Sequence, residues 1–341
     1  MGELRIGLLH PGSMGGAVGT AILATGAEVG WLPEGRSPAT RRRASEFVPI
    51  GDLASRDLIL SICPPAAALE VAEQVVASGF TGDYLEANAI SPARARQIAD
   101  LLTQHGIRMV DGGIVGPPPR RPGTTRLYLS GPAEPMARFR ALFETTALRA
   151  IAIPIANPAQ PAAAGEGGGS GMDGVPGSTG QEPAAAGGPG SGGGTVAGSG
   201  PETDTAPSAS PEGTPVQDSP IGAASALKLA FSSYNKITQV LAGQAHAMAQ
   251  RYGVGDELLE LADATSPGTP FGNPERLRDA AAKAWRWTPE FHEIAAALTA
   301  IGAPAGLPEA AAEWLGRWSA HKDDPEVEVA QLIADLIDPP A

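Results

Sequence analysis

Residues 4–15, which read LRIGLLHPGSMG, decide the fold of the first half of the chain. The apolar run at residues 4–9 leads directly into a turn at residues 10–12, and a helical pattern begins at about Met14. A strand that passes through a glycine-containing turn into a helix is typical of parallel sheets that bind a phosphate group at the helix N-terminus. This stretch therefore predicts the first strand, turn and helix of an α/β domain.

Apolar runs alternate with helical patterns from this stretch to about residue 155. After the first run, strand-like segments occur at residues 28–32, 57–63, 84–87, 108–111, 126–130 and 151–155. Strands that alternate with helices of about 10–15 residues imply right-handed crossovers and a largely parallel sheet. The continuous apolar run at residues 57–63 indicates a strand buried on both faces. We therefore predict a doubly wound, Rossmann-type α/β domain over residues 1–155.

The composition changes sharply after this domain. Residues 156–219 contain no Lys, Arg, aromatic residue, Leu or Ile, and consist mainly of Gly, Ala, Pro, Ser and Thr with seven acidic residues. Such a segment cannot bury enough apolar surface to offset the conformational entropy of the chain. We predict a disordered, acidic linker rich in Gly, Pro and Ala at residues 156–219.

Helical patterns dominate residues 220–338. The chain of 341 residues is longer than the roughly 250–300 residues that a single core usually serves, so a second domain is expected. A proline-free stretch begins near Ile221 and ends at Gly253, which is a natural helix stop, and it predicts a helix of about 45 Å. Because helical patterns continue to residue 337, we predict an all-α C-terminal domain over residues 220–338.

Charge and composition exclude several classes of protein. The formal net charge is -13, which argues against a nucleic-acid partner, since such binding needs a basic face. The single cysteine, Cys63, cannot form an internal disulfide, and no Cys/His cluster has metal-ligand spacing, so we expect no metal. No apolar run reaches the ~18–20 residues of a membrane span, and the first strand-like run leaves no room for a signal peptide. We expect a cytoplasmic protein without a membrane partner.

The first turn carries the features of a dinucleotide site. Such a turn needs a tight bend, close backbone approach to a pyrophosphate and close packing of the helix on the strand. Gly12 and Gly15 can supply the last two, while His10 stands where the first glycine of the usual motif would be. The predicted cofactor-binding residues of the turn are His10, Pro11, Gly12, Ser13, Met14 and Gly15.

The residues after the second strand bear on the choice of cofactor. An acidic residue there favours NAD through the ribose hydroxyls, whereas an arginine favours the 2′-phosphate of NADP. Arg36 and Ser37 are both suited to hold a phosphate, and Glu34 is the competing candidate. We expect NADP, with NAD as the alternative.

Six segments together resemble a known superfamily. They are GLLHPGSMG (7–15), SICPPAA (61–67), YLEANAISP (84–92), VDGGIVGPPP (110–119), GAASALKLAFSSYNK (222–236) and KAWRWTPEFHEIA (283–295). In combination they resemble the β-hydroxyacid dehydrogenase / 6-phosphogluconate dehydrogenase-like superfamily. The resemblance is strongest to the branch whose helical domain is called a putative phosphogluconate dehydrogenase NAD-binding C-terminal domain, and it spans nearly all of the chain except the linker.

The resemblance implies an oxidoreductase in which one lysine transfers a proton. Members oxidise 3-hydroxy acids to 3-oxo acids or run the reverse reduction, and a lysine of the interdomain helix exchanges the proton of the substrate hydroxyl. The matching position is Lys228. A lysine in a mostly apolar helix beside a cleft is desolvated, which brings its pKa toward the range useful for general acid/base work. The alternative reading of Lys228 is a solvated helix lysine.

Other site residues follow from the same resemblance. Cys63, Pro64 and Pro65 are expected to border the ribose and nicotinamide of the cofactor, and Asn88 to touch the nicotinamide side. The resemblance also implies a substrate loop that begins at Asp111. The predicted substrate-binding residues are Gly112, Gly113, Val115, Ser232 and Asn235, the two glycines because their N–H groups could approach a carboxylate.

Two departures from the family pattern keep other functions open. Ser232 stands where members usually carry an asparagine, and Val115 stands where they usually carry a serine. These losses leave room for an imine or ketone reductase on the same fold. A third reading is a non-catalytic, NADP-binding dimeric protein. In each case small-residue helix faces favour a homodimer, and the first two readings need a small-molecule substrate.

Overall fold

The computed structural model describes residues 4–154 and 218–338, which lie in one compact unit. The predicted linker, residues 156–219, falls outside the described residues except for its last two positions. Asp218 accepts a hydrogen bond from the Ala133 N–H (2.6 Å), and Ser219 exchanges backbone and side-chain hydrogen bonds with Gly131. The chain therefore returns to the sheet before the helical domain begins.

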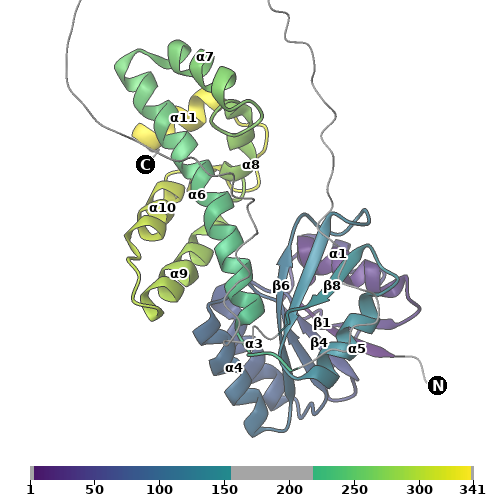
Figure 1. Cartoon of the computed structure of the whole chain (residues 1–341). Coiled ribbons are helices and arrows are strands. Elements are labelled where there is room, and N and C mark those ends of the chain that lie inside the picture. Colours follow the sequence, from purple (N-terminus) through teal and green to yellow (C-terminus); the bar gives the residue numbers. More distant parts are fainter. Residues whose placement is uncertain (1–3, 155–217, 339–341) are drawn as a thin grey trace, which may run out of the picture. The chain divides into compact units, whose positions relative to one another are not determined.

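An eight-stranded sheet forms the N-terminal domain (Figure 1). The strand order is β3-β2-β1-β4-β5-β6-β7-β8. The strands are β1 (Arg5–Leu9), β2 (Glu28–Trp31), β3 (Val48–Pro49), β4 (Leu58–Ser61), β5 (Asp83–Glu86), β6 (Arg108–Val115), β7 (Thr125–Ser130) and β8 (Leu148–Ala152). The predicted Rossmann-type sheet is confirmed.

One pair of strands departs from the parallel pattern. Strand β6 continues to Val115, beyond the predicted residues 108–111, and pairs antiparallel with β7, whereas all other neighbours are parallel. The connection at residues 116–124 is too short for a parallel crossover, which needs about a dozen residues or more. Loop length therefore determines this antiparallel pair.

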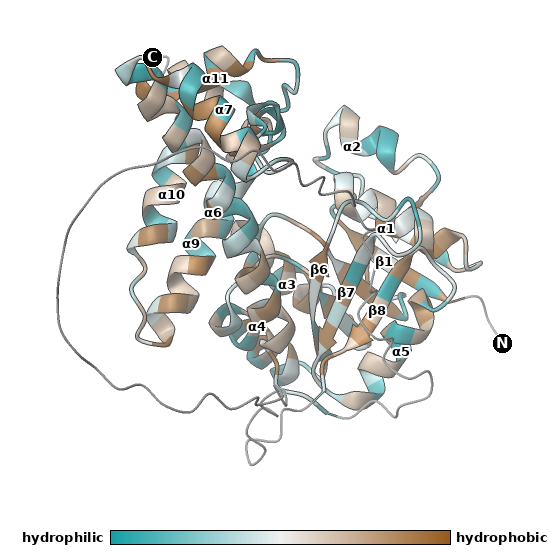
Figure 2. Cartoon of the chain, turned by 45° about the horizontal axis from the view of Figure 1, so that its top comes forward, coloured by the Kyte–Doolittle hydropathy of each residue, from teal (hydrophilic) through white to brown (hydrophobic). Residues whose placement is uncertain are grey.

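Helices cover both faces of the sheet and enclose two cores. On one face α1 (Ser13–Leu23) and α5 (Ala133–Phe143) share a core with Leu58 and Leu60 of β4. On the other face α3 (Ala68–Ala77) and α4 (Pro92–Gln104) pack with Ile59. Alternate residues of one apolar strand thus enter opposite cores, as expected for a strand buried on both faces. Figure 2 shows hydrophobic residues along the strands and mixed hydropathy on the helices.

The described C-terminal residues are helical, so the predicted all-α domain is confirmed. The α-helices are α6 (Ala223–Tyr252), α7 (Gly255–Thr265), α8 (Leu277–Ala281), α9 (Ala284–Ala300), α10 (Gly306–Gly316) and α11 (Val329–Ile337), with short 3-10 helices η2 (Pro274–Arg276) and η3 (Ser319–His321). Helix α6 has 30 residues and ends at Gly253, whose positive φ of 72° closes the helix as predicted. A separate apolar core, centred on residues such as Trp318 and Phe291, joins these helices.

Asp111 connects the sheet to the long helix α6. Its carboxylate accepts hydrogen bonds from the N–H groups of Gly222 and Ser225 (both 3.0 Å) and from the Ser225 hydroxyl (2.5 Å). These are donors at the start of a helix, where N–H groups lack helical partners and the helix dipole favours a negative charge. Burial raises the pKa of Asp111, and the hydrogen bonds from Ser225 oppose that rise. The start of α6 is therefore fixed to β6 by a buried carboxylate.

Glu293 of α9 makes a second connection between the domains. It accepts a hydrogen bond from the Ser91 N–H (2.7 Å) at the start of α4 and pairs with Arg94 (2.8 Å).

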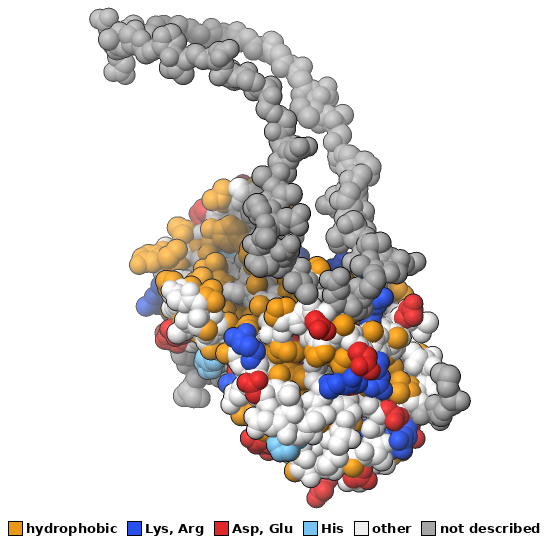
Figure 3. All heavy atoms as spheres, turned by 60° about the horizontal axis from the view of Figure 1, so that its bottom comes forward, with side chains coloured by type: hydrophobic (Ala, Val, Ile, Leu, Met, Phe, Trp, Pro, Cys, Tyr) orange, Lys and Arg blue, Asp and Glu red, His pale blue; other side chains and the backbone are white. Residues whose placement is uncertain are grey.

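On the face shown in Figure 3, acidic and basic side chains are interspersed. No helix among residues 4–154 and 218–338 is both long and apolar enough to span a bilayer, and these residues contain no group of three or more potential metal ligands.

Candidate functional site

The turn after β1 forms an open cradle at the start of α1. Gly12 precedes the helix, and no side chain caps its first N–H groups. A Cβ at Gly12 would meet no atom nearer than 3.9 Å, whereas a Cβ at Gly15 would lie 2.8 Å from the His10 carbonyl oxygen. Gly12 thus leaves space for a ligand, and Gly15 allows the helix to approach the strand. These are the properties that a pyrophosphate cradle requires, and cofactor binding by the predicted turn residues stays a prediction.

His10 occupies the position of the missing first glycine at a conformational cost. Its φ is 62°, in the left-handed region that side chains other than glycine seldom adopt. Its Nδ1 atom is buried without a hydrogen-bond partner. Burial and the nearby charge of Arg36 lower the pKa of His10 to about 4, so the ring is neutral at pH 7. His10 therefore adds no positive charge to the turn.

Arg36 lies beside the same turn, after β2. Burial lowers its pKa, and its charge acts on both His10 and Cys63, which follow β1 and β4. The guanidinium therefore lies near the carboxyl ends of three neighbouring strands. Ser37 is exposed and caps helix α2 (Pro38–Arg43) by accepting a hydrogen bond from the Thr40 N–H (3.2 Å). Of this predicted pair, Arg36 has the more available side chain, because its guanidinium makes only a long hydrogen bond of 3.5 Å, to the Leu32 carbonyl oxygen, within the described residues.

Asn88 fixes the loop after β4 through hydrogen bonds of its side-chain amide. Its Oδ1 accepts a hydrogen bond from the Cys63 N–H (2.5 Å), and its Nδ2 donates to the Ser61 hydroxyl (3.0 Å). The residue is 3% exposed, so both polar atoms of its amide are engaged within the protein. Asn88 thus positions the segment that contains Cys63, Pro64 and Pro65, while its predicted contact with the nicotinamide stays a prediction. Burial raises the pKa of Cys63 to about 12, which keeps the thiol protonated.

A buried glutamate lies beneath this loop and was not identified from the sequence. Glu86, at the end of β5, accepts hydrogen bonds from the Asn88 N–H (3.0 Å) and the Tyr84 hydroxyl (3.2 Å). In the sheet register it lies between Ser61 and Asp111. Burial raises the pKa of Glu86 to about 8. An acidic residue inside the apolar run at residues 84–87 was the available signal.

The glycines of the predicted substrate loop serve packing. A Cβ at Gly112 would lie 2.8 Å from Leu85 Cδ1, and one at Gly113 would lie 2.6 Å from the Ala224 carbonyl oxygen. Both positions are buried. They allow β5 and α6 to approach β6, and the predicted contact of their N–H groups with a substrate carboxylate stays a prediction. Val115, at the end of β6, is partly exposed and remains a candidate for substrate contact.

Lys228 lies on the first turns of α6, over the end of β6. Its Nζ donates a hydrogen bond to the Ile114 carbonyl oxygen (2.6 Å). Burial lowers the pKa of Lys228, while Glu290 opposes this effect and Arg286 adds to it. The half-buried, hydrogen-bonded side chain favours the catalytic interpretation over a solvated helix lysine, and the role of Lys228 stays a prediction. Ser232, one turn further along α6, is 4% exposed and is near enough to Glu290 to lower its pKa.

Lys236 and Glu290 complete this part of the site, and neither was predicted. Lys236 lies one turn beyond Ser232 on α6 and forms an ion pair with Glu290 of α9. Its Nζ also lies 5.0 Å from the centre of the Trp287 ring. The eight-residue interval from Lys228 was a signal for a shared helix face. The pairing with Glu290 had none, because the two residues lie 54 positions apart in the sequence.

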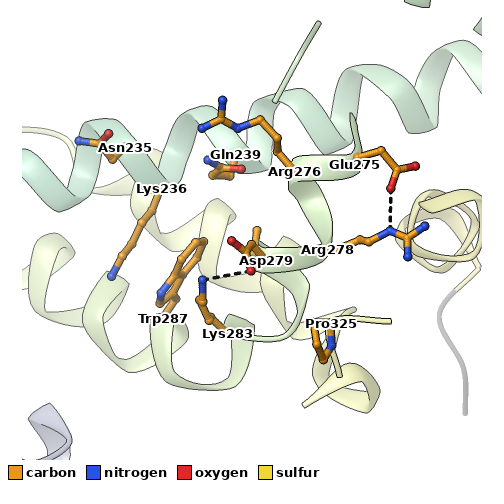
Figure 4. A pocket seen from close by; sticks show the side chains of 11 residues that line it. Asn235, Lys236, Gln239, Glu275, Arg276, Arg278, Asp279, Lys283, Trp287 and Pro325 are labelled. Atoms are coloured by element: carbon orange, nitrogen blue, oxygen red, sulfur yellow. Dashed lines mark ion pairs between the residues drawn. The ribbon is translucent and has the colours of Figure 1, made fainter. Parts of the chain in front are cut away.

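A cavity of about 580 Å³ extends from Lys236 across the helical domain (Figure 4). Its lining comes from α6, η2, α8 and α9 and includes Asn235, Lys236, Gln239, Lys283 and Trp287. Asn235, a predicted substrate residue, lines this cavity and donates to the Phe231 carbonyl (2.9 Å). No residue of the N-terminal domain lines it, so the cavity is distinct from the turn after β1.

The turn and the lysine share one edge of the sheet. The carboxyl ends of β1 and β6 are three strand steps apart, or about 14 Å at ~4.8 Å per step. The order in which strands join the sheet reverses between the parallel neighbours β1 and β4, and ligands of open α/β sheets bind outside the carboxyl ends at such a switch point. The fold and site thus define a class: a Rossmann-type domain joined to an all-helical domain by a helix whose lysine faces the sheet edge.

Comparisons with known proteins support this class at the level of the fold. Residues 249–318 match a family described as a domain of unknown function (DUF1932), and no curated protein matches the sequence. The structure is similar to 3-hydroxyisobutyrate dehydrogenase of Mycobacterium tuberculosis, solved with L-serine, at 14% identity and a TM-score of 0.61. That match covers 98% of this chain and 99% of the dehydrogenase.

Two further solved structures have the same fold. A conserved protein of unknown function, described as structurally similar to 3-hydroxyacid dehydrogenases, is 20% identical with a TM-score of 0.56, covering 93% of this chain and 98% of that chain. Psf3, solved with NADP+ and 2-OPP, is 11% identical with a TM-score of 0.56, covering 97% and 99%. The resemblance to the β-hydroxyacid dehydrogenase / 6-phosphogluconate dehydrogenase-like superfamily is thus confirmed for the fold.

Proposed function

We propose that the protein is an NADP-dependent oxidoreductase that transfers a hydride between the cofactor and a 3-hydroxyacid-type small molecule. The observation that carries this proposal is the position of Lys228, whose Nζ is held at the end of β6, on the sheet edge that also carries the glycine turn. A nicotinamide dinucleotide supplies the hydride acceptor or donor. The protein supplies the orientation and the proton transfer.

The residues of the turn fit a dinucleotide. Gly12 leaves the space in front of the α1 N-terminus open, and the uncapped N–H groups there suit a pyrophosphate. Arg36, partly buried beside the turn, suits the 2′-phosphate that distinguishes NADP from NAD. The likeness in fold to Psf3, which was solved with NADP+, supports the same cofactor class.

Lys228 is the proposed general acid/base. During oxidation its neutral amine takes the proton of the substrate hydroxyl, and during reduction the ammonium returns it. Burial lowers the pKa of Lys228, which makes the neutral amine accessible nearer to pH 7. One N–H of Lys228 donates to the Ile114 carbonyl oxygen, which fixes the position of Nζ. The nitrogen lone pair and the other N–H of the neutral amine stay available to the substrate.

Replacing this amine tests the proposal. Lys228→Met should lower turnover of 3-hydroxy acids with NADP+ by at least about 100-fold, because proton transfer by a positioned group contributes that much or more. NADPH binding, followed by fluorescence titration, should stay within about twofold. Lys322→Met is the matched control, since Lys322 is exposed on the helical domain. Unchanged turnover in Lys228→Met would reject the assignment.

An imine or ketone reductase on the same fold is the second candidate. Two positions favour it: Val115 and the small hydroxyl of Ser232 stand where the family usually offers a serine and an asparagine to its hydroxy acids. NADPH consumption that requires both a ketone and an amine would support this candidate over the first. A non-catalytic NADP-binding protein would instead bind NADPH and turn over no member of either substrate panel.

We also propose a homodimer that buries one face of α6. Large apolar side chains stay exposed along this helix, each three, four or seven residues after the one before it. They are Leu227, Phe231, Tyr234, Leu241, Met248 and Tyr252. Such spacing is typical of a helix that packs against another helix. Phe231→Asp combined with Met248→Asp should therefore give a monomer in sedimentation experiments. A monomeric wild-type protein would contradict the dimer.

A further inference from the structure

Two amines of α6 share one carboxylate. The whole chain contains four lysines, Lys228, Lys236, Lys283 and Lys322, and the first two lie on the α6 face that meets α9. At 1.5 Å per residue, their Cα atoms are about 12 Å apart along the helix. Glu290 of α9 acts on both, so one carboxylate serves two lysine amines.

The ion pair engages only one of the two carboxylate oxygens of Glu290. Lys236 binds Oε2 of Glu290, and the two side chains are only 15% and 8% exposed. The other oxygen, Oε1, is buried and has no hydrogen bond of good geometry among the described residues, although the neighbouring Ser232 hydroxyl also acts on this carboxylate. An unpartnered buried carboxylate oxygen is costly, which indicates that a further donor reaches Glu290 in some state of the protein.

The surroundings provide two further donors, the Ser232 hydroxyl and Lys228, of which only Lys228 can carry a charge. The charged groups that face it are Glu290 and Arg286 from α9 and Lys236 from its own helix, while β6 presents the uncharged Ile114 carbonyl. A buried ammonium needs a counter-ion. While Lys236 holds Glu290, Lys228 is therefore favoured in its neutral form.

We propose that Glu290 is a shared counter-ion and the positioning residue for Lys228, so that Lys236 controls the proton affinity of the catalytic amine. The proposal rests on the proposed function of Lys228. In the oxidation, the hydride leaves the substrate carbon for the nicotinamide dinucleotide. The hydroxyl O–H bond breaks, an N–H bond forms on Lys228, and the new ammonium donates a hydrogen bond to Oε1 of Glu290.

The pKa values of the two lysines support this arrangement. Burial lowers the pKa of Lys236 to about 8, against the attraction of Glu290, and the charge of Lys228 lowers it further. Burial alone would raise the pKa of Glu290, but Lys236 and Lys228 hold it below its ordinary value. The carboxylate thus stays ionised while the two amines compete for it.

The test measures the lysine pKa values directly on the full chain. With lysine labelled by ¹³C at Cε, four signals are expected, and each is assigned by its loss in a lysine-to-methionine variant. Glu290→Gln removes the counter-ion and should lower the pKa of Lys228 by at least one unit. Lys236→Met frees Glu290 and removes a repelling charge, so it should raise the pKa of Lys228 by a similar amount. Lys322→Met should change neither value.

Opposite shifts are the signature of a shared counter-ion, since a merely structural disturbance would not move the Lys228 pKa in both directions. The proposal would be overturned if both variants shifted the Lys228 pKa in the same direction, or if Lys236→Met did not shift it. If Glu290→Gln fails to fold, the result for Lys236→Met decides alone. The pH profile of kcat/KM should shift with the pKa. If the two variants shift the Lys228 pKa in opposite directions but the protein turns over no substrate, Glu290 is still the shared counter-ion and the proposed function is rejected.

Discussion

The two halves of the site use different means to handle charge. On the nucleotide side, glycines shape the backbone, the His10 ring is neutral, and Arg36 contributes the cation. On the helical side, long side chains from α6 and α9 place two amines against one carboxylate. The first half is therefore encoded locally in one turn, whereas the second depends on the packing of two distant helices.

The largest effect is expected where the two halves meet, at Gly113. A Cβ there would lie 2.6 Å from the Ala224 carbonyl oxygen and 3.1 Å from Lys228 Cβ. Gly113→Val should displace α6 and lower turnover by about 100-fold, because a shift near 1 Å at a catalytic group costs that much. NADPH binding, measured by fluorescence, should be nearly unchanged. Equal losses in both measurements would show that the halves are not separable. Gly51→Ala, at an exposed position where a Cβ would meet no atom within 4 Å, is the control for a glycine substitution.

An intermediate effect is expected on the nucleotide side alone. Arg36→Gln removes a charge-assisted hydrogen bond of about 1.5–3 kcal/mol, which corresponds to about 10- to 100-fold weaker NADPH binding. NADH binding should change little, since NADH lacks the 2′-phosphate. Titrations with both cofactors check this, and Arg42→Gln, on the exposed side of α2, is the control. Equal loss of NADH and NADPH affinity would contradict a 2′-phosphate role.

The smallest effect concerns Glu86, which lies between the two halves. Its pKa is about 8 in the folded protein, above the ordinary value of 4.5. Between these pH values the folded protein retains a proton that the unfolded chain loses, so the free energy of unfolding should fall as the pH rises through this window.

Glu86→Gln cannot ionise and should flatten this decline. Urea denaturation at pH 5, 6.5 and 8 measures it, and Glu73→Gln, exposed on α3, should retain the wild-type slope. A decline of equal steepness in Glu86→Gln would assign the pH dependence to another group.

Local patterns predicted most of the fold. The strand–turn–helix at residues 4–15 and the stop at Gly253 depend on neighbours in the sequence, and both occur as predicted. The antiparallel β6–β7 pair was not predicted, because the end of β6 lies in a glycine-rich run that lacks strand patterning. Patterns in a single sequence predict which residues form each element, but they do not predict how the elements pair.

The site follows the same division. Lys228 was identified from its motif, and the structure places it at the sheet edge. Asn88 was predicted to touch the nicotinamide, and its role in holding the Cys63 loop was not predicted, because hydrogen bonds to positions 25 and 27 residues away cannot be read from a motif. Glu290 went unnoticed for the same reason, since its partner lies on another helix.

The attachment of α6 to the sheet constrains how the helices can move. Asp111 binds the first turn of this helix, and Ile114 binds Lys228 one turn later, so both anchors belong to β6. Any swing of the helical domain that leaves these anchors in place must hinge beyond Lys228, so the amine would keep its distance from the sheet. Glu290 is restrained as well, because Glu293, one turn further along α9, is bound to Ser91 and Arg94 of the N-terminal domain.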